Sequence, residues 1–357
     1  MEENKQHKTA LPETEPIPSA QAPEALLDIR GLRVEYHTDE DVVYAVNGLD
    51  LTIGQGESLG LVGETGAGKT TTALSVLRLI ADPPGKIMGG EIWFEGEDML
   101  QAKPARLREI RGSKISVIFQ DPMTSLNPVY SVGDQIAEVI HQHEKCSKEE
   151  GRRKAGDMLE MVGIPRARYD EYPHQFSGGM KQRVVIAMSI ACSPELILAD
   201  EPTTALDVTI QAQVLELMNE LKEKLRTSLL LITHDLGVVA QVCDRVAIMY
   251  AGEIVESGTI AEVFDHPHHP YTIGLFGSIP SLDETAEKLK PIQGQMPDPT
   301  ELPEGCAFAP RCPYATGACR TRKPEMTGVG GTQMVRCLAH QGVFESPELM
   351  EEVRHGR

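Results

Sequence analysis

The sequence has few aromatic residues and no excess of positive charge. Phe, Trp and Tyr make up 4% of its 357 residues, so the core that 41% hydrophobic residues allow must be mainly aliphatic. Lys and Arg number 34 against 53 Asp and Glu, which gives a net charge of −19. Nucleic-acid binders need clustered basic side chains against the phosphates. The balance therefore favours an acidic soluble protein with no nucleic-acid partner.

Long apolar runs are also lacking. The longest candidate, VVIAMSIAC at 184–192, falls short of the roughly 18 to 20 residues that span a bilayer and fits a buried helix. Residues 1–25 lack the basic start and apolar stretch of a signal peptide. Their Glu- and Pro-rich composition predicts a disordered tail. We expect a cytosolic protein that reaches a membrane only through a partner.

Short apolar runs predict an α/β protein from residue 26 onward. A helix is expected at 70–80, ended by the Pro83–Pro84 pair. A mostly helical stretch at about 121–194 predicts an inserted helical subdomain. Composition shifts near the HPHHPYT segment, so we expect a main domain at 26–267 and a small module at 268–357. Strands are predicted at 26–36, 57–62, 91–96, 114–120, 196–200, 228–233 and 245–258, the last with a hairpin at Ala251–Gly252.

A glycine-rich segment, GETGAGKT, runs from Gly63 to Thr70 and matches the pattern G-x-x-x-x-G-K-[ST] in full. Glycines allow backbone N–H groups to close around phosphates, and the next helix adds its positive N-terminal end. We expect Lys69 to reach the β- and γ-phosphates and the Thr70 hydroxyl to bind Mg²⁺. A strand before the segment and a helix after it favour a phosphate loop over an ordinary turn.

Polar residues follow three other predicted strands. Asp200 ends the strand LILAD and is expected to hold Mg²⁺ through water, while Glu201 is placed to polarise the attacking water. The alternative is that both carboxylates cap the next helix. His234 follows the strand SLLLIT and is expected near the γ-phosphate. Gln120 ends the strand KISVIFQ and is expected to sense Mg²⁺ or the water.

These segments, in this order, resemble the ATP-binding cassette (ABC) ATPases from residue 27 to about 267. The set includes SGGMKQ from Ser177 and ALD at Ala205–Asp207, and Met180 stands where the family commonly has Gln. The resemblance implies a P-loop α/β core with an inserted helical subdomain. It also implies a head-to-tail dimer, in which the SGG signature closes over the ATP that the partner's phosphate loop holds.

The resemblance assigns residues to the ATP site. It places an aromatic side chain on adenine, with Tyr36 first and Tyr44 as the alternative. The catalytic residues are then Glu201, His234 and Gln120, and the Mg²⁺ ligands are Thr70, Gln120 and Asp200. The nucleotide-binding residues are Tyr36, Gly63, Glu64, Thr65, Gly66, Ala67, Gly68, Lys69, Thr70, Thr71, Gln120, Ser177, Gly178, Gly179 and Asp207.

Longer strings narrow the resemblance. YPHQFSGGMKQRVVIAMSIAC, ADEPTTALDVTIQAQ and HPHHPYT are similar to the ATP-binding subunits of bacterial oligopeptide and dipeptide importers, through the C-terminal module. The implied protein is an ATP hydrolase on the cytoplasmic face of the plasma membrane. Its implied partners are a sister ATPase subunit, two permease subunits and an extracytoplasmic substrate-binding protein. A nickel importer, a soluble non-transport ABC ATPase and a regulatory subunit are the alternatives.

Four of the seven cysteines lie between Cys306 and Cys337, the others being Cys312 and Cys319. A reducing cytosol disfavours disulfides there. No C-x₂-C pair is present, which argues against structural zinc. Four thiolates suffice for a [4Fe–4S] cluster, and the importer resemblance implies one. Zinc and free thiols remain the alternatives.

For two other features of the C-terminal region we expect no binding site. The histidines of HPHHPYT, namely His266, His268 and His269, are expected to form a structural connector, because the prolines hold the chain extended. Between 305 and 340, five basic residues oppose one Glu, a net charge of +4. A solvated loop is expected there, and a surface toward a partner is the alternative.

Overall fold

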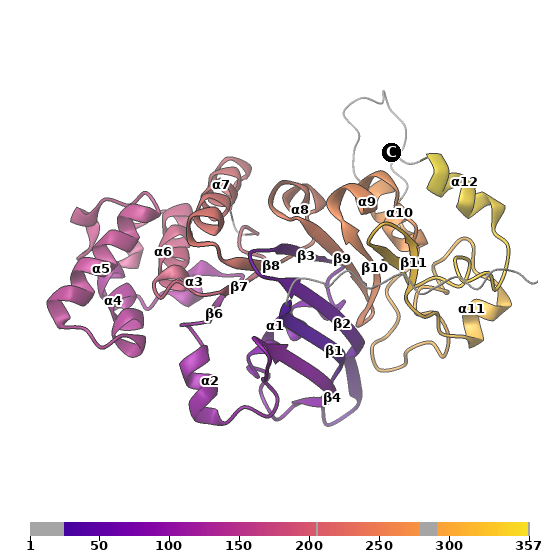
Figure 1. Cartoon of the computed structure of the whole chain (residues 1–357), viewed down its shortest axis with the longest axis horizontal. Helices are drawn as coiled ribbons and strands as arrows, with labels where there is room; N and C mark the ends of the chain where they lie inside the picture. Colours follow the sequence, from indigo (N-terminus) through magenta and orange to yellow (C-terminus); the bar gives the residue numbers. More distant parts are fainter. Residues whose placement is uncertain (1–24, 205, 279–290, 356–357) are drawn as a thin grey trace, which may run out of the picture.

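The computed structural model describes residues 25–204, 206–278 and 291–355. An antiparallel sheet lies against a larger, mainly parallel sheet, and helices cover the larger sheet (Figure 1). The predicted disordered tail, apart from Ala25, lies outside the described residues. None of the helices in these ranges is long and apolar enough to cross a bilayer.

The antiparallel sheet has the strand order β2-β1-β4-β5, with β1 Ala25–His37, β2 Val42–Gly54, β4 Gly85–Phe94 and β5 Glu97–Asp98. Leu27 and Ile29 of β1 are fully buried, as the alternation in the sequence predicts, and after a register shift between Ile29 and Leu32 the buried positions become Leu32 and Val34. The strand β2 was not predicted. Its sequence, VVYAVNGLDLTIG, is interrupted by Asn and Gly, which are depleted in strands, and pairing with β1 supplies the missing preference.

The larger sheet has the order β11-β12-β10-β9-β3-β8-β7-β6. Strands β9, β3, β8, β7 and β6 run parallel, so the loops at the carboxyl ends of β3, β7 and β8 meet at one edge. The predicted hairpin between β9 and β10 is present. The bounds are β3 Ser58–Val62, β6 Ile115–Ile118, β7 Leu196–Asp200, β8 Ser228–Thr233, β9 Arg245–Tyr250, β10 Glu253–Thr259, β11 Thr327–Gly330 and β12 Gln333–Val335.

Helices α3 to α6 fall between β6 and β7 and gather at the opposite end of the molecule from α11 and α12 (Figure 1). The helix predicted to reach residue 80 is wrong at its end: α1 stops at Val76, because Arg78 takes φ +50 and leaves the helical region. The bounds are α1 Lys69–Val76, α2 Pro104–Ile110, α3 Pro122–Ser125, α4 Val132–His143, α5 Lys148–Met161, α6 Gly178–Ile190, α7 Val208–Leu225, α8 Leu236–Val242, α9 Ile260–Asp265, α10 Pro270–Gly277, α11 Gly317–Thr321 and α12 Pro347–His355.

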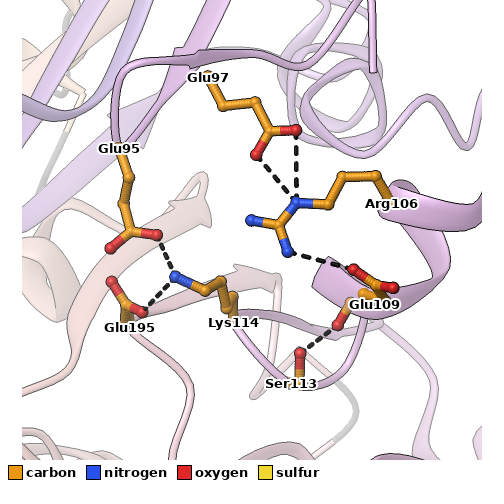
Figure 2. Close-up of polar contacts among 7 residues, drawn as sticks. All are labelled: Glu95, Glu97, Arg106, Glu109, Ser113, Lys114 and Glu195. Carbon is orange, nitrogen blue, oxygen red and sulfur yellow. Dashed lines mark hydrogen bonds and ion pairs between the residues drawn. The ribbon is translucent and has the colours of Figure 1, made fainter. Parts of the chain in front are cut away.

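Ion pairs join the two sheets near α2 (Figure 2). Lys114, just before β6, bridges Glu95 after β4 and Glu195 before β7, the latter at 3.1 Å. Arg106 of α2 binds Glu97 at 3.0 Å and Glu109 at 3.3 Å. Lys114 thus links the two sheets, while Arg106 links α2 to β5; partly exposed pairs of this kind contribute little to stability.

The HPHHPYT segment is built into the core by Glu256 of β10. The backbone N–H groups of His268 and His269 donate to the Glu256 carboxylate at 2.7 and 2.9 Å. His269 Nδ1 accepts the N–H of Tyr271 at 3.0 Å and so begins α10. Burial lowers the pKa of His269 to about 3, which keeps its ring neutral. These contacts give His268 and His269 structural roles.

Candidate ATP site

The phosphate loop connects β3 to α1 and leaves no room for side chains at two glycines. A Cβ on Gly63 would lie 2.2 Å from the Met249 carbonyl oxygen, and one on Gly68 would lie 2.3 Å from that of Ala45. The buried Lys69 Nζ donates to the carbonyls of Gly63 at 2.7 Å and Glu64 at 3.0 Å. The ammonium group is therefore held within the loop, where a triphosphate would need it.

Charge in the loop is balanced by the carboxylates at the end of β7. Burial lowers the pKa of Lys69, and Glu201 and Asp200 oppose that shift. Burial also raises the pKa of Asp200, whose side chain hydrogen-bonds to Thr70. A hydroxyl beside a carboxylate, both adjoining the loop, is the oxygen donor set that Mg²⁺ takes with ATP. The residues present fit ATP with Mg²⁺.

Three residues converge on Glu201. Its carboxylate accepts from Gln120 Nε2 at 2.8 Å and Thr204 Oγ1 at 2.9 Å, and it lies 3.0 Å from His234 Nδ1. Burial alone would raise the pKa of Glu201, but its contacts with His234 and Thr204 outweigh burial and lower it. Glu201 is thus an ionised carboxylate. The sequence analysis did not predict a role for Thr204, although a hydroxyl three residues after a Glu is close enough along the chain to bond to its carboxylate.

Neither Asp200 nor Glu201 caps the next helix. Asp207 does so, accepting the N–H of Ile210 at 3.0 Å at the start of α7. Ala205, in the predicted ALD segment, lies outside the described residues. Gln120 stands two residues beyond β6 rather than at its end, and from there its amide reaches Glu201.

The SGG signature begins α6. The Ser177 hydroxyl accepts the N–H of Met180 at 3.4 Å, as a helix N-cap does. Ser177 and Gly178 are exposed, whereas a Cβ on Gly179 would lie 2.3 Å from a methyl group of Ile210 in α7. Gly179 of the signature is thus packed against α7, whereas Ser177 and Gly178 face solvent.

Tyr36 and Tyr44 differ in their relation to the loop. Tyr36 is half-buried, and its hydroxyl lies 3.2 Å from Thr71 Oγ1 in α1. Tyr44 is 38% exposed, and its backbone N–H donates to Pro299 at 2.8 Å. The contact with Thr71 places Tyr36 next to the phosphate loop, which favours it as the adenine-stacking residue.

We expect Tyr36→Ala to weaken ATP binding by about tenfold, because base–aromatic stacking contributes about 1 to 3 kcal/mol. Tyr44→Ala is the matched control and should change affinity less than twofold, a margin of roughly 0.4 kcal/mol. Titration of each full-length variant with a fluorescent ATP analogue gives the dissociation constants. A larger loss in the Tyr44 variant would transfer the assignment to Tyr44.

The four C-terminal cysteines line one small cavity together with Phe308 and Leu338. Its volume of about 20 Å³ has room for roughly one water. Burial raises the pKa of Cys306 to about 11 and that of Cys312 to about 12. Within the described ranges, no three His, Cys, Asp or Glu side chains are grouped to hold a metal ion. The prediction of an iron–sulfur site gains no support here.

A phosphate loop after β3, an Asp–Glu pair at the end of β7 and a helical insertion that carries SGG define an ABC-type ATPase. Residues 46–204 match the family model for ABC transporters, and residues 255–319 match the oligopeptide/dipeptide transporter C-terminal region. The chain belongs to the ABC transporter ATPases, in the group that carries this C-terminal region.

Several curated relatives are similar over most of their length. The oligopeptide transport ATP-binding protein OppD of Bacillus subtilis is 50% identical, over 91% of this chain and 93% of that protein. AppD of the same organism, also an oligopeptide transport ATP-binding protein, is 48% identical over 88% and 97%. The dipeptide transport ATP-binding protein DppD, again from Bacillus subtilis, is 48% identical over 88% and 94%.

A solved structure supports the fold. The ATP-binding cassette MJ0796, a dimer in a post-hydrolysis state bound to ADP and phosphate, superposes with a TM-score of 0.59 at 28% identity. The match covers 66% of this chain and 98% of that one. The predicted P-loop ABC core is confirmed.

Proposed function

We propose that this chain powers the import of di- or oligopeptides through a separate membrane permease. The main support is the match of residues 255–319 to the oligopeptide/dipeptide transporter C-terminal region, in a chain that also carries the phosphate loop and the Asp200–Glu201 pair. The names of the relatives, which are oligopeptide and dipeptide transport proteins, support it. The chain would work at the cytoplasmic face of the plasma membrane.

The residues at the site suit hydrolysis of the γ-phosphate. Lys69 would neutralise the β- and γ-phosphates, and Glu201 would take a proton from the attacking water. The water oxygen bonds to phosphorus while the bond to the β-phosphate oxygen breaks, giving ADP and phosphate. His234 and Gln120 hold the Glu201 carboxylate in place. Thr70, Gln120 and Asp200 would hold Mg²⁺, which would supply positive charge for the transferred group.

Exposed side chains suggest where partners bind. Ser177 and Gly178 would contact ATP held by a second ATPase subunit, a non-identical sister chain. Phe119, Val129 and Tyr130 are exposed by 46%, 72% and 55%, and they border the start of the helical insertion. Exposed apolar residues of this kind suit docking to permease loops. Two permease subunits would in turn receive cargo from an extracytoplasmic binding protein.

Uptake in cells that lack this chain tests the proposal. Labelled dipeptide, a longer peptide and nickel are offered side by side, before and after the wild-type chain is restored. We expect the loss of one peptide class, recovered with wild-type protein and not with Glu201→Gln. Loss of nickel uptake alone would favour the nickel importer. If all three are unaffected, peptide import is wrong and an ABC ATPase with another partner remains.

The iron–sulfur cluster stays a prediction of the resemblance. Iron, acid-labile sulfide and zinc are measured in full-length protein purified without oxygen. About four irons and four sulfides per chain would establish a [4Fe–4S] cluster, one zinc would establish the alternative, and neither would leave the thiols free.

A further inference from the structure

A buried arginine of the cysteine region, Arg311, forms an ion pair with Glu64 in the phosphate loop. Arg311 Nη1 lies 2.8 Å from Glu64 Oε2, and Nη2 lies 3.1 Å from Oε1. Two parallel charge-assisted bonds of this kind are the strongest that arginine makes with a carboxylate. The Arg311 side chain is only 6% exposed. The expectation that the basic residues here form a solvated loop is therefore wrong for Arg311.

Other contacts hold both ends of this pair. Arg311 Nε donates to the Gln293 carbonyl at 3.1 Å, and Nη1 lies 3.4 Å from the Tyr250 hydroxyl. The Tyr271 hydroxyl accepts the backbone N–H of Glu64 at 3.1 Å. The aromatic pair Tyr250 and Tyr271 packs with ring centroids 4.7 Å apart. Both the main chain and the side chain of Glu64 are thus fixed from outside the loop.

The contacts that hold Glu64 also affect Lys69, the residue expected to bind the phosphates of ATP. The Glu64 carbonyl accepts from Lys69 Nζ at 3.0 Å, so a shift of Glu64 would displace the ammonium group. Farther along the loop, the Met296 methyl group lies 3.5 Å from where a Cβ on Gly66 would stand. The segment around 293–311 therefore backs the phosphate loop on the side that Arg311 occupies.

We propose that Arg311 is a positioning residue for ATP binding: it holds Glu64, and through it Lys69, in the geometry that the triphosphate needs. The C-terminal region thereby sets the nucleotide affinity of the ATPase core. Arg311 is followed directly by Cys312, which lines the cysteine cavity. A structural change in that cavity could therefore shift Arg311 and, through Glu64, the phosphate loop. The proposal rests on ATP binding at this loop, which wild-type titration tests separately.

The test measures ATP affinity and stability together on the full-length chain. We expect Arg311→Gln and Glu64→Gln each to raise the dissociation constant of a fluorescent ATP analogue by about tenfold, roughly the loss of one charge-assisted bond. The double variant should be no weaker than either single one, because both remove the same pair. Arg311→Lys should recover part of the affinity.

The matched control is Arg245→Gln, which breaks a 3.0 Å ion pair with Glu57. Glu57 precedes β3 and so lies at the end of that strand away from the loop. This variant should lower the melting temperature without changing ATP affinity. If Arg311→Gln behaves in the same way, with affinity unchanged, the proposal is overturned. If Arg311→Gln does not fold, the ATP affinity of Glu64→Gln tests the proposal instead, because this variant keeps the other contacts of Arg311.

Discussion

We expect Glu201→Gln to lower ATP turnover by about 10²- to 10⁴-fold while leaving ATP binding intact, as loss of a positioned base does. The substitution keeps the shape of the side chain and removes its charge. The amide nitrogen cannot accept a proton from water, and it would face one of the three donors that now converge on the carboxylate. The closed, ATP-bound state should then accumulate.

The measurement is ATP hydrolysis by the assembled transporter, with ATP binding titrated in parallel. Glu195→Gln is a close control, because Glu195 and Glu201 flank the same strand, β7, at opposite ends. Glu195 pairs with Lys114 in the joint between the sheets (Figure 2). Its substitution should leave turnover within about twofold of wild type, a difference of roughly 0.4 kcal/mol in the barrier. Unchanged turnover in the Glu201 variant would refute its role as base.

The parts of the site that follow buried strands were predictable from the sequence. The runs LILAD and SLLLIT become β7 and β8 with the predicted bounds, because strands buried on both faces are continuous apolar runs. Since neighbouring parallel strands end at one edge, the residues after them meet. The sequence predicted a place at the γ-phosphate for His234 and at the attacking water for Glu201, and the structure brings the two side chains within 3.0 Å.

Contacts between distant segments were not predictable. Arg311 and Glu64 are separated by 247 positions, and nothing in the local sequence of either indicates the other. The early end of α1 was also not predictable, because the run TTTALSVLRLI contains no residue that stops a helix at Val76. The positive φ of Arg78 depends on tertiary context, which the local sequence does not indicate. The four clustered cysteines do share one cavity, but the iron–sulfur site predicted for them gains no support, because no metal-binding group is found among the described residues.

We expect Gly63→Ala to weaken ATP binding at least tenfold and to lower the melting temperature by several degrees, on the order of 1 to 3 kcal/mol of overpacking. The added Cβ would lie 2.2 Å from the carbonyl oxygen and 3.2 Å from the carbonyl carbon of Met249. Those atoms belong to the backbone of β9, which pairs with β3 in the buried sheet. Since that backbone cannot rotate away as a side chain could, the start of the loop must move instead.

A second glycine isolates this effect from the general cost of replacing glycine. Gly89 in β4, like Gly63, has no positive φ, and a Cβ there would meet nothing within 4 Å. Gly89→Ala should therefore retain the wild-type affinity for a fluorescent ATP analogue and the wild-type melting temperature. Normal ATP binding by Gly63→Ala would show that the loop can shift away from β9 and still hold the triphosphate. The close approach of Gly63 to Met249 would then serve packing of the sheet and not the nucleotide.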